Sequence, residues 1–167
     1  MTSLLNQDPA LRRLALRTPE GLLAFGFGAG LSRHAPGTAG TILAVPPGLL
    51  LINLPPGVYW SILVLCFLLG IYVCGVCSEK LGVEDPGAIV WDEMVAFWLT
   101  VAFVPLSWPW WLAAFVLFRF FDIVKPWPIP ALEKRLHGGL GIMFDDVVAA
   151  VYAMVILALA ARLIYSV

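Results

Sequence analysis

Long charge-free apolar runs are the feature that most limits what this chain can fold into. No Asp, Glu, Lys or Arg occurs at positions 34–78, 94–118 or 147–161. Runs of this length can enter or cross a lipid bilayer, whose hydrocarbon core takes about 20 helical residues. Since 61% of the residues are hydrophobic and the mean hydropathy is +0.93, we expect an all-α, membrane-embedded bundle of about four to five helices.

Prolines divide these apolar runs. The segment 38–54 contains a Pro-Pro pair that should kink or interrupt a helix, and 58–77 is a predicted span. The run 94–118 contains Pro105 and Pro109, so it is either one long span or, as we favour, a hairpin of two short helices. A hairpin places every charged segment on one face, which the positive-inside rule makes cytoplasmic. The last span, 147–164, then crosses outward.

The remaining sequence gives few further constraints. The 167 residues predict one domain covering 1–167, with a surface helix at 1–25. Its arginines interrupt the apolar residues and no small-residue cleavage site follows, so it is not interpreted as a signal peptide. The net charge of −1 argues against a nucleic-acid partner. The three cysteines share one apolar run and are interpreted as small buried residues.

Five carboxylates lie at the ends of the apolar runs: Asp92, Glu93, Asp122, Asp145 and Asp146. An ionised carboxylate inside a membrane helix costs about 2.5–3.5 kcal/mol, so five at membrane edges suggest a function. Carboxylates favour hard divalent cations such as Mg²⁺ over zinc. Such a cation could neutralise a phosphate and activate a water molecule.

Each acidic segment also has a structural interpretation. The first pair could simply face water at the interface. Asp122 could form an internal ion pair with Arg119 and Lys125, whose long side chains can snorkel, and Lys125 lies three residues later on the same helix face. The glycine-rich segment 138–141 is expected to form a tight loop, and one aspartate of the following pair could cap the last helix. The charged residues 133–135 are expected to lie on a solvated surface helix.

A second glycine-rich segment, 26–41, is the candidate phosphate site. Glycines permit close backbone approach, and exposed N–H groups can hold an anion. The candidate binding residues here are Ser32, Arg33, Gly37 and Thr38. The segment has no Gly-Lys-Ser/Thr and is therefore not a Walker A loop. The alternative is a flexible re-entrant loop that packs against helices.

Four segments together resemble the phosphatidylglycerophosphatase A family: GLSRHAPGTAGT (30–41), IVWDE (89–93), FRFFDIVKPWPI (118–129) and GGLGIMFDDVVAA (138–150). The resemblance extends from about Gly26 to Tyr152 with the motifs in the family's order. It implies a small all-helical fold with a central helix. It also implies Mg²⁺-dependent removal of the terminal phosphate from phosphatidylglycerophosphate, giving phosphatidylglycerol and inorganic phosphate, at the cytoplasmic face of the bacterial inner membrane.

The resemblance also implies roles for individual residues. The five carboxylates would be catalytic and metal-binding, and the phosphate would be held by Ser32, Arg33, Gly37, Thr38 and Lys125. Arg33-His34 stands where Pro-Lys is common in the family, which puts a role for His34 in doubt, and Ala150 stands where a glycine is expected. The implied partners are the phospholipid substrate and membrane lipid, with no protein partner.

Other functions fit the sequence less well. Another lipid-phosphate phosphatase or phosphotransferase is the nearest alternative, but the paired Arg/His motifs and the spaced Asp-Gly…Ala-Arg…Asp pattern are absent. A small transporter would need acids near the centres of its spans, whereas these lie at the ends. A purely structural membrane protein would not explain why glycine-rich segments and aspartates cluster together.

Overall fold

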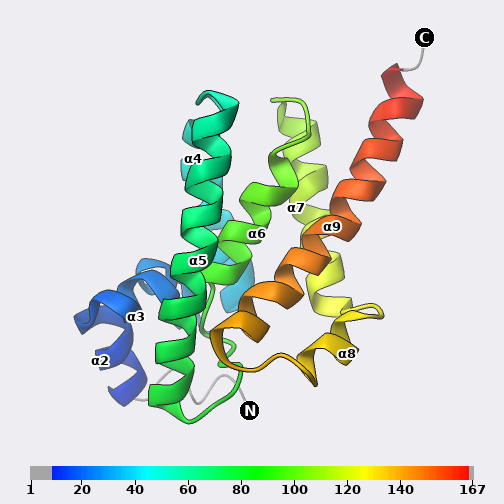
Figure 1. Cartoon of the computed structure of the whole chain (residues 1–167). Helices are drawn as coiled ribbons and strands as arrows, with labels where there is room; N and C mark the ends of the chain where they lie inside the picture. Colours follow the sequence, from blue (N-terminus) through cyan, green and yellow to red (C-terminus); the bar gives the residue numbers. More distant parts are fainter. Residues whose placement is uncertain (1–8, 166–167) are drawn as a thin grey trace.

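The computed structural model describes residues 9–165, which form a bundle of helices (Figure 1). In chain order these are α2 (Pro9–Arg17), α3 (Pro19–Ala24), the 3-10 helix η1 (Gly26–Leu31), α4 (Pro36–Leu51), α5 (Pro56–Leu81), α6 (Trp91–Val101), α7 (Trp108–Val124), α8 (Ile129–Glu133) and α9 (Gly138–Tyr165). Residues 9–165 contain no strand, which confirms the all-helical prediction. Two short helices, α2 and α3, occupy the second part of the predicted surface helix, and its residues 1–8 lie outside the described residues.

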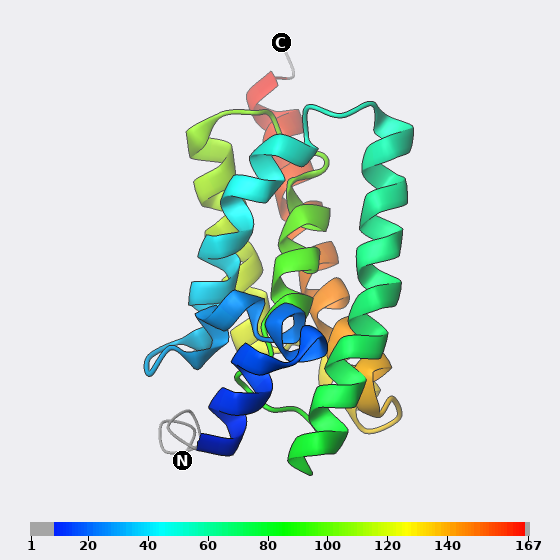
Figure 2. The same ribbon diagram turned by 90° about the vertical axis from the view of Figure 1, so that its left-hand side faces the viewer.

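Helix α6 lies at the centre, and α4, α5, α7 and α9 pack around it (Figures 1 and 2). Ten of its 11 residues are buried, so it has no free face. Aromatic donors tie it to its neighbours: Trp91 Nε1 donates to the Cys66 carbonyl at 3.0 Å, and Trp98 Nε1 to the Ala44 carbonyl at 2.8 Å. The Tyr59 hydroxyl donates to the Trp98 carbonyl at 2.6 Å. These bonds satisfy the polar tips of buried aromatic side chains and fix α6 against α4 and α5.

Two helices, α5 and α9, are long and apolar enough to cross a membrane. Only 33% and 22% of their most apolar stretches are buried, so most of each stretch faces outward. A soluble protein rarely exposes such continuous apolar surface, whereas lipid covers it at little cost. The outward faces of α5 and α9 therefore indicate a membrane protein.

The run 94–118 is a hairpin. Residues 102–107 separate α6 from α7, and Pro109 lies in the first turn of α7. This connection lies at the same end of the bundle as the one between α4 and α5 (Figure 2). The opposite end holds α2, α3, α8 and the start of α9 (Figure 1). The charged segments are thus gathered at one end, as the hairpin interpretation predicted.

Helix α4 continues through Pro46 and Pro47, so of the two predicted effects of this pair, a kink or an interruption, the interruption does not occur. One predicted boundary is wrong. Helix α9 begins at Gly138, so the expected loop at 138–141 is its first turn. The reason is close packing on α5, because a Cβ atom at Gly139 would lie 1.8 Å from the Ile71 carbonyl oxygen and 2.7 Å from Gly75 N. These glycines allow two helix backbones to approach each other, which a loop does not require.

Candidate active site

The first two acids lie at the start of the central helix. Asp92 and Glu93 occupy the first turn of α6 and are only 8% and 9% exposed, so they do not face water as the structural interpretation proposed. The segment before them is anchored by the Val90 N–H, which donates to the Ala24 carbonyl at 2.9 Å. The positive end of a helix dipole favours carboxylates at this position.

Arg119 joins the first acids to the third. Its Nη1 lies 2.6 Å from Glu93 Oε1 and 2.7 Å from Asp122 Oδ2, and all three side chains are largely buried. Asp122 therefore pairs with Arg119, as predicted, whereas the predicted pairing with Lys125 is not formed. Lys125 ends α7 in a left-handed conformation, with φ of 45°, which turns it off the helix face that it was expected to share.

Lys125 instead connects α7 to α8 and α9. Its Nζ lies 2.7 Å from Asp145 Oδ2 and also binds the Glu133 carboxylate. Burial alone would lower the pKa of Lys125, but its hydrogen bonds to Asp145 and Glu133 raise that pKa above its ordinary value. The ammonium therefore stays charged. Glu133 belongs to this cluster, although the sequence placed it on a solvated surface helix.

The last two acids do not cap a helix. Asp145 and Asp146 lie in the third turn of α9, because α9 starts at Gly138, and they are 7% and 3% exposed. Helix α9 packs against both α6 and α7, which brings this pair toward the first acids. Asp146 interacts electrostatically with Asp92, Glu93 and Asp122. All five predicted carboxylates therefore lie in one region, where three helices meet.

The glycine-rich segment 26–41 is mostly helical, with η1 followed by a short bend and the start of α4. Ser32 Oγ donates to the His34 carbonyl at 2.8 Å, and Arg33 is exposed. Gly37 and Thr38 lie in the first turn of α4, whose N-cap residue, Ala35, offers it no side-chain hydrogen bond. A helix start of this kind presents backbone N–H groups suited to an anion.

Gly37 also brings α4 against the acids. A Cβ atom at this position would lie 1.7 Å from Glu93 Oε1 and 2.7 Å from Arg119 Nη1. Only glycine lets the helix backbone approach the Glu93–Arg119 pair so closely. The structure therefore places the predicted phosphate segment beside the predicted acids at this one contact.

Three buried carboxylate oxygens in this region have no hydrogen-bond partner among residues 9–165: Asp92 Oδ1, Glu93 Oε2 and Asp146 Oδ2. A buried charge without a partner is costly, and a bound cation is one way to compensate it. As the side chains stand, the described part of the chain contains no group of three or more His, Cys, Asp or Glu residues arranged to hold a metal ion. The donor set is nevertheless all-oxygen and suits Mg²⁺.

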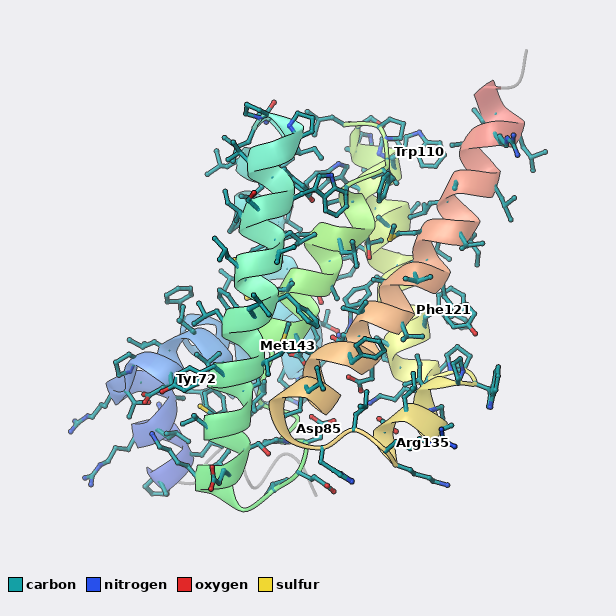
Figure 3. All side chains as sticks on the ribbon, in the orientation of Figure 1. Tyr72, Asp85, Trp110, Phe121, Arg135 and Met143 are labelled. Carbon is teal, nitrogen blue, oxygen red and sulfur yellow. The ribbon has the colours of Figure 1, made fainter. Side chains whose placement is uncertain are left out.

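A cavity of about 210 Å³ adjoins the Lys125 cluster at the charged end of the bundle. Asp145 and Glu133 line it, together with Asp85 of the loop between α5 and α6. Figure 3 shows Asp85 and Arg135 at this end, opposite Trp110. The sequence did not single out Asp85 as a site residue, and it named Arg119 only as a possible ion-pair partner of Asp122.

Comparison with known proteins gives one consistent family. The family described as phosphatidylglycerophosphatase A matches residues 22–161. The chain is 46% identical over 154 residues to phosphatidylglycerophosphatase A of Haemophilus influenzae, covering 91% of this chain and 94% of that protein. It is 43% identical over 153 residues to the Escherichia coli protein of the same name, covering 91% and 89%.

A further relative carries a different name. A Bacteroides thetaiotaomicron protein named "Putative phosphatidylinositol-3-phosphatase" is 42% identical over 147 residues, which covers 83% of this chain and 91% of that protein. No solved structure matches the chain.

Proposed function

The chain belongs to the phosphatidylglycerophosphatase A family, and we propose that it is a Mg²⁺-dependent lipid phosphatase whose active site is the carboxylate cluster at the charged end of the bundle. It hydrolyses phosphatidylglycerophosphate to phosphatidylglycerol and inorganic phosphate. The observation that supports Mg²⁺ is the set of three buried carboxylate oxygens without partners on α6 and α9.

Asp92, Glu93 and Asp146 would hold the cation through these oxygens. When bound, Mg²⁺ would neutralise the charge of the phosphate and make a water molecule more acidic. The other two acids are oriented by ion pairs, Asp122 with Arg119 and Asp145 with Lys125. Both add negative charge to the site.

The substrate phosphate would lie at the start of α4. The backbone N–H groups of Gly37 and Thr38 face an anion there, with Ser32 and Arg33 in the preceding bend and Lys125 across the site. A carboxylate of the cluster would accept a proton from the attacking water as its oxygen bonds to phosphorus, and would return that proton to the glycerol oxygen as the bond between this oxygen and phosphorus breaks. Attack in line with that leaving oxygen releases inorganic phosphate.

The charge distribution supports a particular membrane arrangement. We infer that α4, α5, the α6–α7 hairpin and α9 are embedded in the bacterial inner membrane, with the charged end in the cytoplasm. The arginines of α2 and the basic residues after α8 lie at that end, whereas the connections at 52–55 and 102–107 carry no charge. This asymmetry agrees with the positive-inside rule.

The Bacteroides relative supports a second candidate substrate, phosphatidylinositol 3-phosphate. Both lipids carry a phosphate monoester on the headgroup of a glycerophospholipid, so the same cluster could act on either. The two candidates differ in the alcohol that leaves, glycerol or inositol, and a direct comparison of the two lipids distinguishes them.

The decisive experiment is phosphate release from phosphatidylglycerophosphate in detergent micelles, with Mg²⁺ or with a chelator. We expect release only with Mg²⁺, and loss of release in Asp122→Ala and Asp145→Ala. Glu79→Ala is the matched control, because this exposed acid lies at the same end but outside the cluster. No release by the unmodified protein, or undiminished release by both cluster variants, overturns the assignment.

A further inference from the structure

An apolar groove of about 620 Å³ runs between α4 and α7. It is lined from α4 by Ile42, Val45 and Leu49 and from α7 by Trp111, Leu112 and Phe115, and it ends at residues 106–108 of the hairpin connection. All of these side chains are apolar except Ser107. Nothing in the catalytic proposal uses this groove.

The groove exists because of how the two helices pack. Helices α4 and α7 each pack against the central α6, and their backbones rarely come close to each other, so a channel lined by side chains remains between them. Figure 2 shows α4 in cyan beside α7, on the side of the bundle away from α5. The groove therefore lies on an outer face of a membrane protein, where lipid can enter from the side.

The near end of the groove adjoins the active site. Phe115 lies four residues before Arg119, and Ile42 five residues after Gly37, which is about 6–8 Å along each helix. The far end, at Leu49, lies 12 residues beyond Gly37, or about 18 Å along α4. The groove thus leads from the phosphate end of the bundle toward the end that holds the α4–α5 and α6–α7 connections, in the direction that a lipid tail takes from its headgroup.

We propose that this groove holds one acyl chain of the lipid substrate while its phosphate lies at the start of α4. This inference rests on the proposed lipid phosphatase function and specifies how that substrate is positioned. Lipid tails are as apolar as the groove, so transfer of a chain from the bilayer contributes little affinity. The groove instead fixes the position of the phosphate relative to the carboxylates, which governs the rate of reaction.

A groove-filling variant tests this role. Val45→Trp places a large side chain in the groove, whereas Val64→Trp adds the same side chain to an exposed position on the outer face of α5. Each variant is assayed on phosphatidylglycerophosphate and on its deacylated, water-soluble headgroup, glycerophosphoglycerophosphate. We expect Val45→Trp to lower kcat/KM for the lipid by about tenfold or more and to leave kcat/KM for the headgroup within about twofold. Val64→Trp should change neither.

Two outcomes overturn the inference. An unchanged kcat/KM of Val45→Trp on the lipid means that the groove holds only bulk lipid. An equal loss of kcat/KM on both substrates means that the substitution disturbs helix packing and has no effect specific to the acyl chain. As a second measurement, a substrate with a diazirine in its acyl chain should cross-link to residues 42–49 and 106–115, and cross-links confined to α5 and α9 contradict the proposal.

Failure of the proposed function is distinguishable from failure of the groove. If the unmodified protein releases no phosphate from phosphatidylglycerophosphate or its headgroup, the substrate assignment fails. The same variants are then compared on phosphatidylinositol 3-phosphate and its deacylated headgroup. The groove proposal then predicts the same difference, a lower kcat/KM of Val45→Trp on the lipid but not on its headgroup.

Discussion

Replacing Gly37 with alanine tests whether the contact between α4 and the Glu93–Arg119 pair positions the active site. The new Cβ atom would lie 1.7 Å from Glu93 Oε1, and non-bonded carbon and oxygen atoms rarely approach below about 3 Å. Either the carboxylate or the start of α4 must therefore move by more than about 1 Å, and a misplacement of that size costs about 100-fold in rate. We expect kcat/KM to fall by about that factor, equivalent to about 2.7 kcal/mol of transition-state stabilisation.

The assay is Mg²⁺-dependent phosphate release, with thermal unfolding in detergent measured in parallel. Overpacking of this kind lowers the free energy of unfolding by about 1–3 kcal/mol, so the variant should remain folded at assay temperature. Gly57→Ala is a matched control. Gly57 also follows a proline in the first turn of a helix, but a Cβ atom there would have no neighbour within 4 Å.

A second substitution separates a steric cause from a general loss of stability. Glu93→Asp shortens the side chain by one methylene group and makes room for the new Cβ atom. The double variant Gly37→Ala/Glu93→Asp should therefore lose less activity than the two single effects predict. Full activity in Gly37→Ala, or equal losses in Gly37→Ala and Gly57→Ala, would refute the reasoning.

Three further predictions follow from the same geometry. Arg119→Ala leaves two largely buried carboxylates without their cation and should lower the free energy of unfolding by about 3–5 kcal/mol, measured by denaturant titration; an unchanged midpoint would contradict the buried pairing. Asp146→Asn should abolish Mg²⁺-dependent release without loss of thermal stability, because it removes a buried charge that has no partner; retained activity would exclude Asp146 from the site. In sealed inner-membrane vesicles, Ser107→Cys and Arg135→Cys should react with an impermeant thiol reagent from opposite sides; labelling of both from one side would reject the proposed topology.

The sequence predicted the course of the chain well where a local physical rule decides it. Pro105 and Pro109 interrupt an apolar run, and two prolines within five residues favour a turn between two helices. The hairpin between α6 and α7 followed from this rule, and with it the gathering of the charged segments at one end. A helix long and apolar enough to be the span predicted at 58–77 is also present, and it continues at both ends as α5.

The sequence failed where the outcome depends on contacts between helices. Glycines at 138–141 suit a loop, but Gly139 is needed for the close approach of α9 to α5, and only the packed structure reveals this. The partner of Lys125 was missed for a similar reason. Its left-handed conformation at the end of α7 directs it to Asp145 and Glu133, and spacing along one helix cannot predict contacts with two others.

Charge balance explains why a cation belongs in the catalytic proposal. In the described part of the site, Glu93 and Asp122 share Arg119, and Glu133 and Asp145 share Lys125. Asp92 and Asp146 form no ion pair there, so six carboxylates face two cationic side chains. A phosphate monoester is itself an anion and would be repelled by this excess of negative charge. A divalent cation at the unpartnered oxygens would reduce the excess, and its first role in the proposed mechanism would be to let the substrate phosphate approach the carboxylates.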